Sequence, residues 1–189
     1  MAQAKVKKRF FDVDIPILNK ETQLFGYKAE ELAGRYILYD LTRLLRGKNS
    51  LLKLKVELEE GKPVAKPVEL TVLPYFIRKM MRKGTNYVED SFSTDCNDAQ
   101  VRLKPFLITR RKVSRAVRKA LRDKTKEELI LYLKDKSYDT MFQELLRGTM
   151  QKTLSLRLKK IYPLSLCEIR TATIEKFLKT ELKKHKTQE

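Results

Sequence analysis

The side chains best suited to chemistry are the basic ones in the stretch RRKVSRAVRKALR, residues 110–122. Arg111, Arg115, Arg118 and Arg122 recur at the spacing of one helical face. Apolar residues recur on the opposite side at the spacing of a buried face, namely Val113, Ala116, Val117, Ala120 and Leu121. The sequence therefore predicts a helix that packs by its apolar stripe and presents a row of guanidinium groups to a polyanion.

The whole chain carries an excess of positive charge. Its 189 residues include 42 Lys and Arg against 24 Asp and Glu, which gives a formal net charge of +18. Surfaces that are charged only for solubility mix both signs and stay nearer neutrality. A polyphosphate such as nucleic acid is the commonest partner of such an excess and is the expected one here, with an anionic membrane the next. No stretch approaches the roughly 20 apolar residues of a membrane span.

Four basic clusters supply the candidate RNA-binding residues. These are Lys5, Lys7, Lys8 and Arg9; Arg78, Lys79, Arg82 and Lys83; Arg110, Arg111, Lys112, Arg115, Arg118, Lys119 and Arg122; and Arg157, Lys159 and Lys160. Four aromatic residues near basic ones could stack on bases, although their alternation favours burial in the core for most of them: Phe10, Phe11, Tyr36 and Tyr39.

Other chemistries find little support. His185 is the only histidine, the glycines are isolated, and Cys96 and Cys167 lack metal-ligand or redox spacing and are interpreted as free thiols of a cytosolic protein. One acidic cluster could hold Mg²⁺ in a nuclease, but a polar turn is the favoured interpretation of its residues, Glu89, Asp90, Asp95 and Asp98. We therefore expect no enzyme activity, metal or cofactor.

The hydropathy pattern predicts an α+β fold with a curved or barrel-like, mainly antiparallel β-sheet and flanking helices. The predicted strands cover 11–15, 35–41, 52–58, 68–73, 87–92, 101–108 and the extended segment 164–173. The predicted helices cover 75–82, 110–122, 126–133, a longer stretch from 138 to 158, and a basic terminal helix at 174–184. The expected organisation is a basic tail (1–9), a single domain (10–173) and a basic C-terminal helix or tail (174–189).

Several short motifs occur in the order seen in one known family. They are Phe10-Phe11-Asp12-Val13 with Pro16; Gly34-Arg35; Phe106-Leu107-Ile108 followed by Arg110 to Arg122; and Ile161-Tyr162-Pro163-Leu164 followed by Arg170. On these residues the chain resembles the archaeal and eukaryotic small-subunit ribosomal protein family S-three-a-e (eS-one in the unified nomenclature). Eukaryotic members carry longer tails, so the chain resembles the archaeal type.

The resemblance implies a structural role in the cytoplasmic ribosome. It implies binding of ribosomal RNA on the platform of the small subunit, near the messenger exit channel and neighbouring platform proteins, with messenger RNA close by. It also implies that the N-terminal lysines and the arginine helix contact RNA, within a barrel-like core with flanking helices. Two alternatives stay open, a free-standing RNA- or DNA-binding factor and a Mg²⁺-dependent nuclease.

Overall fold

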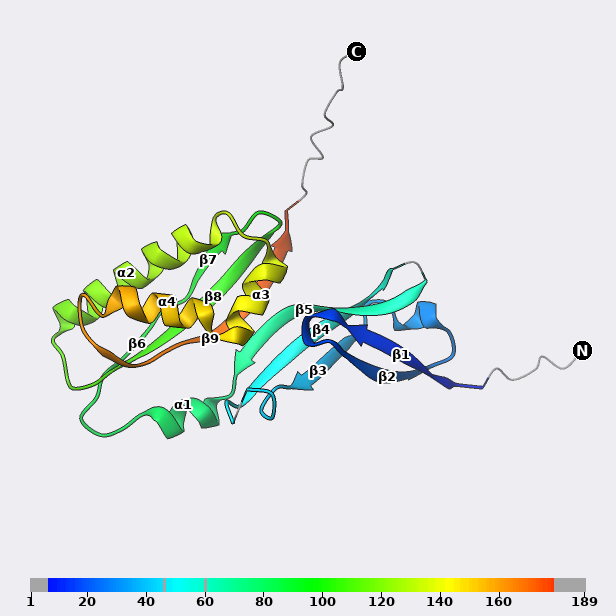
Figure 1. Ribbon diagram of the computed structural model, residues 1–189, viewed down its shortest axis with the longest axis horizontal. Coiled ribbons are helices and arrows are strands. Elements are labelled where there is room, and N and C mark those ends of the chain that lie inside the picture. Colours follow the sequence, from blue (N-terminus) through cyan, green and yellow to red (C-terminus); the bar gives the residue numbers. More distant parts are fainter. Residues whose placement is uncertain (1–6, 46, 60, 179–189) are drawn as a thin grey trace, which may run out of the picture. The chain divides into compact units, whose positions relative to one another are not determined.

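The computed structural model describes residues 7–45, 47–59 and 61–178, and its backbone forms two compact units, Met1–Lys83 and Gly84–Glu189 (Figure 1). None of the helices in these described ranges is long and apolar enough to span a membrane.

The first unit is built on a β-sheet with the strand order β2-β1-β5-β4-β3. The pairing of β1 with β5 is parallel and the other pairings are antiparallel. Its elements are β1 (Arg9–Ile15), η1 (Pro16–Leu18), β2 (Lys20–Gly26), η2 (Ala29–Leu32), β3 (Tyr36–Asp40), β4 (Ser50–Glu59), β5 (Lys62–Val72) and α1 (Pro74–Met80).

Alternation along the strands gives the first unit its core. Leu52, Leu54 and Val56 of β4 are fully buried, as the period-2 pattern predicts, because alternate side chains of a strand point to one face. The two prolines of β5 fall where a missing N–H is tolerated. Pro63 is the second residue of the strand, and Pro67 pairs with Leu54 at a register shift.

The second unit places helices over an antiparallel sheet. Strand β8 pairs with β9 along one edge and with β6 and β7 along the other. Figure 1 shows α2 and α4 side by side over these strands; α2 contacts β6 and β7, and α4 contacts β9. The elements are β6 (Tyr87–Glu89), β7 (Phe92–Asp95), β8 (Ala99–Thr109), α2 (Arg115–Leu133), α3 (Tyr138–Arg147), α4 (Thr149–Leu158) and β9 (Leu164–Phe177).

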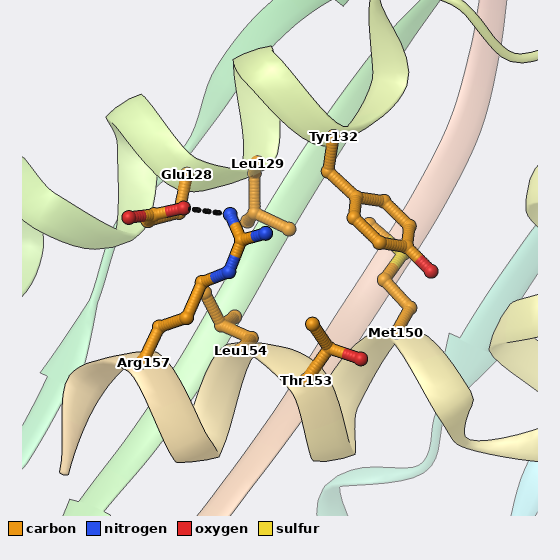
Figure 2. A pocket seen from close by; sticks show the side chains of 7 residues that line it. All are labelled: Glu128, Leu129, Tyr132, Met150, Thr153, Leu154 and Arg157. Atoms are coloured by element: carbon orange, nitrogen blue, oxygen red, sulfur yellow. Dashed lines mark hydrogen bonds and ion pairs between the residues drawn. The ribbon is translucent and has the colours of Figure 1, made fainter.

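The contact between α2 and α4 combines an apolar seam with an ion pair (Figure 2). Leu129 of α2 lies against Leu154 and Met150 of α4 around a very small void, and all three side chains are buried. At the edge of the seam, Arg157 donates a hydrogen bond to Glu128. The carboxylate is the more enclosed partner, with 13% of its side chain exposed against 49% for Arg157.

The helix predicted over 110–122 begins later and runs further than expected. Residues 110–113 are held outside the helix, because Asn86 accepts from the Val113 amide (2.9 Å) and the Thr109 hydroxyl donates to the Arg111 carbonyl (2.7 Å). Ser114 then caps α2 by accepting from the Val117 amide (3.4 Å). From Arg115 the helix continues unbroken to Leu133, so residues 126–133 are helical as predicted but belong to α2 and form no separate helix.

The stretch predicted as one helix from 138 to 158 is two helices. Gly148 has φ +75°, in the left-handed region where glycine lacks the steric penalty of other residues, and it ends α3 and begins α4. Two further predictions need correction. Strand β9 continues to Phe177, so the helix predicted from residue 174 is wrong over 174–177, and residues 179–189 lie outside the described residues. Strand β2 was not predicted.

The α+β class with mainly antiparallel pairing and flanking helices is confirmed, whereas the barrel-like form is not. Across the part of the chain that the structure describes, the first unit's sheet ends at β2 and β3, which do not pair with each other, so no barrel closes. The division into tail, single domain and terminal segment remains a prediction. Its boundary after residue 9 falls one residue inside β1, which begins at Arg9, and its boundary after residue 173 falls inside β9, which continues to Phe177.

The break at Gly148 predicts a backbone effect on stability. An added Cβ would meet nothing within 4 Å, so the cost of Gly148→Ala comes from the positive φ alone. We expect about 1–2 kcal/mol lower free energy of unfolding for Gly148→Ala. Gly148→Asn should lose less, because asparagine tolerates the left-handed region. Denaturant titration measures both variants, and equal stabilities for Ala and Asn would contradict this account.

The ion pair across α2 and α4 predicts a pH-dependent contribution to stability. The hydrogen bond from Arg157 lowers the pKa of Glu128 below its ordinary value. A carboxyl whose pKa is lowered by folding stabilises the protein above its unfolded pKa, and this contribution is lost as the pH falls through the folded pKa. We expect Glu128→Gln to lower the free energy of unfolding by about 0.5–1 kcal/mol at neutral pH.

This difference should vanish in acid, which a series of denaturant titrations from neutral to low pH would measure. Glu127→Gln is the matched control, because Glu127 lies on the same helix and is paired only with Lys124 (3.1 Å) in the described residues. A loss at Glu128 that did not depend on pH would contradict the ion-pair account.

Candidate nucleic-acid interface

Four cationic side chains of α2 gather around one open cavity. Arg115, Arg118, Lys119 and Arg122 lie on one helical face and, with Tyr87 and Val88 of β6, line a hollow of about 270 Å³. We call this the arginine cleft. Helix α2 is held in place by the burial of Leu121 and Leu129, on a stripe that adjoins the cationic face, so its rigid backbone fixes the spacing of the four cations.

The arginine cleft is electrostatically uncompensated. Within the described residues, none of its four cations pairs with a carboxylate, and the Arg118 Nε is buried without a hydrogen-bond partner. A buried donor without a partner costs free energy. Guanidinium groups offer several coplanar donors that match phosphate oxygens. The cleft is therefore suited to binding phosphate groups.

The sequence pointed to the segment that forms the arginine cleft, but it did not predict all of the residues that line it. The predicted row is wrong at Arg111, which precedes α2 together with Arg110 and Lys112, all three exposed. Lys119 takes its place, at the i, i+4 spacing from Arg115. The predicted apolar stripe is confirmed at Leu121, while Ala116 and Ala120 are exposed. Tyr87, with its ring over Phe106 at 5.9 Å, was not a candidate, because only tertiary structure brings β6 to α2.

The other predicted RNA-binding residues do not join the arginine cleft. In the first unit, Arg78 and Lys79 are exposed in the last turn of α1, where basic residues also suit the helix dipole, and Arg82 and Lys83 follow it. In the second unit, Lys159 and Lys160 are exposed after α4. Arg157 is engaged with Glu128.

The N-terminal cluster lies beside aromatic rings. Lys7, Lys8 and Arg9 are exposed, and the Arg9 guanidinium lies 4.7 Å from the centre of the Phe11 ring. Lys5 lies outside the described residues. Taken together, the RNA contacts assigned to these basic residues stay predictions.

The four aromatic residues that could stack on bases are less buried than their alternation led us to expect. Phe11 and Tyr39 are half-buried, but Phe10 is 66% exposed and Tyr36 is 56% exposed. Outward exposure follows from strand alternation, since Phe10 lies on the face of β1 opposite to the buried Val13 and Ile15.

The acidic residues that could have held Mg²⁺ are not brought together. Glu89 pairs with Arg170, Asp90 accepts from the Ser91 amide (2.9 Å), and Asp95 accepts from the Gln100 amide group (3.0 Å). No group of three or more His, Cys, Asp or Glu that could hold a metal ion occurs in the described ranges.

The two cysteines are free thiols in an apolar setting. Burial raises the pKa of Cys96 to about 11 and that of Cys167 to about 12, and neighbouring carboxylates add to both shifts. Neither thiol is activated for nucleophilic chemistry, which needs a lowered pKa.

Comparison with known proteins gives a consistent result. The profile of the Ribosomal S3Ae family matches residues 3–177. A protein of Nanoarchaeum equitans is 27% identical over 179 residues, covering 89% of each chain. A protein of Halorubrum lacusprofundi is 24% identical over 183 residues, covering 93% of this chain and 85% of the relative.

A third relative, from Pyrobaculum aerophilum, is 28% identical over 142 residues, covering 74% of this chain and 64% of its own. All three relatives are named small ribosomal subunit protein eS1, and all three come from archaea. The profile match covers nearly the whole chain, in agreement with the order of motifs seen in the sequence. The chain belongs to the Ribosomal S3Ae family, in its archaeal form.

Proposed function

We propose that this chain is a structural constituent of the small ribosomal subunit that binds ribosomal RNA. Its family and the name shared by its relatives support the ribosomal role. The observation that carries the RNA-binding role is the arginine cleft, in which four cations converge on one hollow without carboxylate partners among the described residues. The role is one of assembly and support, without catalysis or a cofactor.

The proposed mechanism is neutralisation of phosphate charge at fixed positions. Arg115, Lys119 and Arg122 are exposed and displace condensed counterions from the RNA backbone, which favours binding at low salt. Arg118 is half-buried and therefore more restricted, so it sets where a phosphate lies in the cleft. Contacts of this kind determine position and register on the RNA rather than base sequence.

The proposed location follows from the family resemblance. We place the chain on the platform of the small subunit, near the messenger exit channel, with neighbouring platform proteins and messenger RNA close by. The ribosome would then hold it in the cytoplasm.

The arginine cleft predicts a change in salt dependence. Arg115→Ala with Arg122→Ala removes two exposed cations that line the cleft. We expect the slope of log affinity against log salt for ribosomal RNA to fall by about 0.7–0.9 for each phosphate that is no longer neutralised, with an unchanged melting temperature. Filter binding across a range of salt concentrations measures the slope.

Lys126→Ala with Lys134→Ala is the matched control. It removes the same charge from two exposed positions that do not line the cleft, one within α2 and one at its C-cap. Equal slopes for the two double variants would show that only total charge matters and would overturn the role of the cleft.

The ribosomal role itself predicts co-sedimentation with the small subunit. In a sucrose gradient of a lysate from the native cells, immunoblotting should find the chain in the small-subunit peak at near-unit stoichiometry, also after a moderate salt wash. A signal confined to the top of the gradient would instead favour a free-standing RNA- or DNA-binding factor.

A further inference from the structure

The outward face of the β1–β2 hairpin carries aromatic residues where a solvent-facing strand normally carries polar ones. Phe11, Val13 and Ile15 point inward, so Phe10 points outward, and its antiparallel partner Phe25 lies directly opposite on β2. Neither ring is covered by the rest of the described chain, since both are counted among its exposed large hydrophobic side chains.

These aromatic residues form one patch together with a lysine. The ring centres of Phe10 and Phe25 are 5.0 Å apart and tilted by 46°. The Lys8 Nζ lies 5.8 Å from the Phe25 ring centre and 5.1 Å from that of Tyr27, which is also exposed. We call Lys8, Phe10, Phe25 and Tyr27 the hairpin patch.

Charge divides the outward face of the hairpin into two ends. Beyond the rings, this face carries Asp12, Asp14 and Glu21, all exposed, with Gln23 donating to Asp12 (2.9 Å). At the patch end, Lys8 is flanked along the chain by Lys7 and Arg9, also exposed. A polyanion is therefore attracted to the aromatic end and repelled from the acidic end.

We propose that the hairpin patch binds unpaired RNA nucleotides, with bases stacked on its exposed rings and the neighbouring phosphates near Lys8. Adjacent aromatic rings beside cations are the means by which sheet surfaces hold single-stranded RNA. Duplex RNA cannot use the rings, because its bases are already stacked inside the helix. The basic flank favours RNA over a protein partner, for which exposed aromatic rings alone would suffice.

This inference rests on the proposed RNA-binding function but uses different residues. The hairpin patch belongs to the first unit, and the arginine cleft belongs to the second. The two sites make different demands on the RNA, since stacking needs unpaired bases and the cleft needs only phosphates.

The first test replaces the rings by apolar side chains without a π-face in the full-length chain. Phe10→Leu with Phe25→Leu keeps all charges, and its melting temperature checks the fold. We expect affinity for a fluorescent oligouridylate, whose bases are largely unstacked, to fall by about tenfold or more. Affinity for a blunt RNA duplex of the same length should stay unchanged.

Tyr36→Leu is the matched control, because Tyr36 is similarly exposed on β3 and lies 4.6 Å from the Lys53 Nζ. It should leave oligouridylate affinity unchanged. Unchanged oligouridylate affinity in the Phe10/Phe25 variant, an equal loss for the duplex, or an equal loss for Tyr36→Leu would each overturn the proposal.

A second test keeps an aromatic ring at every aromatic position of the hairpin patch. The chain has no tryptophan, so Phe10→Trp introduces a single fluorescent reporter. Oligouridylate should quench its emission by stacking, and the duplex should not. Absence of quenching by oligouridylate would overturn the hairpin proposal even if the arginine-cleft variants alter the salt slope as expected, in which case the proposed function would stand without it.

Discussion

Burial of the apolar stripe of α2 is the constraint on which the arginine cleft depends. Leu121, Leu129 and Leu133 are almost completely enclosed, which fixes the rotation of the helix about its axis. A helix so fixed directs the residues of its other faces without further contacts. The cations of the cleft thus obtain their positions from apolar packing along the adjoining stripe of the helix, and they need no carboxylate partners to hold them.

The basic residues fall into two groups that the sequence alone does not separate. Arg157 and Arg170 are engaged by Glu128 and Glu89, which are far away along the chain, and so contribute to the internal structure of the second unit. Arg115 and Arg122 have no such partner in the described residues. Composition counts all of these residues alike, although only cations left without a carboxylate add their full charge to the surface field.

Much of the fold could be predicted because its signals are local. The alternation in 52–58 and the helical spacing around Leu121 arise within a few residues; the alternation holds as far as Val56, and the helix forms, although Leu121 alone of its predicted apolar stripe is fully buried. The errors occur where a distant residue or a single backbone angle determines where a helix begins or ends. Asn86 keeps residues 110–113 out of α2, and the positive φ of Gly148 separates two helices whose apolar pattern runs on without interruption.

The candidate site was likewise predictable only where its signal is local. Its arginines were visible from their spacing, whereas Tyr87 and the exposure of Phe10 depend on the pairing of strands.

The two free thiols have a consequence for how the second unit could be observed. With pKa values of about 11 and 12, Cys96 and Cys167 are almost entirely protonated at neutral pH and react slowly with electrophiles while the unit is closed. Cys167 lies in β9, opposite Leu107 of β8, and Cys96 lies just after β7, with its amide donating to the Ala99 carbonyl. Cys96 is buried, so its alkylation requires the turn between β7 and β8 to open, whereas Cys167 is only half-buried. Cys96 is thus a native probe for opening of the turn between β7 and β8, and its alkylation rate measures how often this part of the second unit opens.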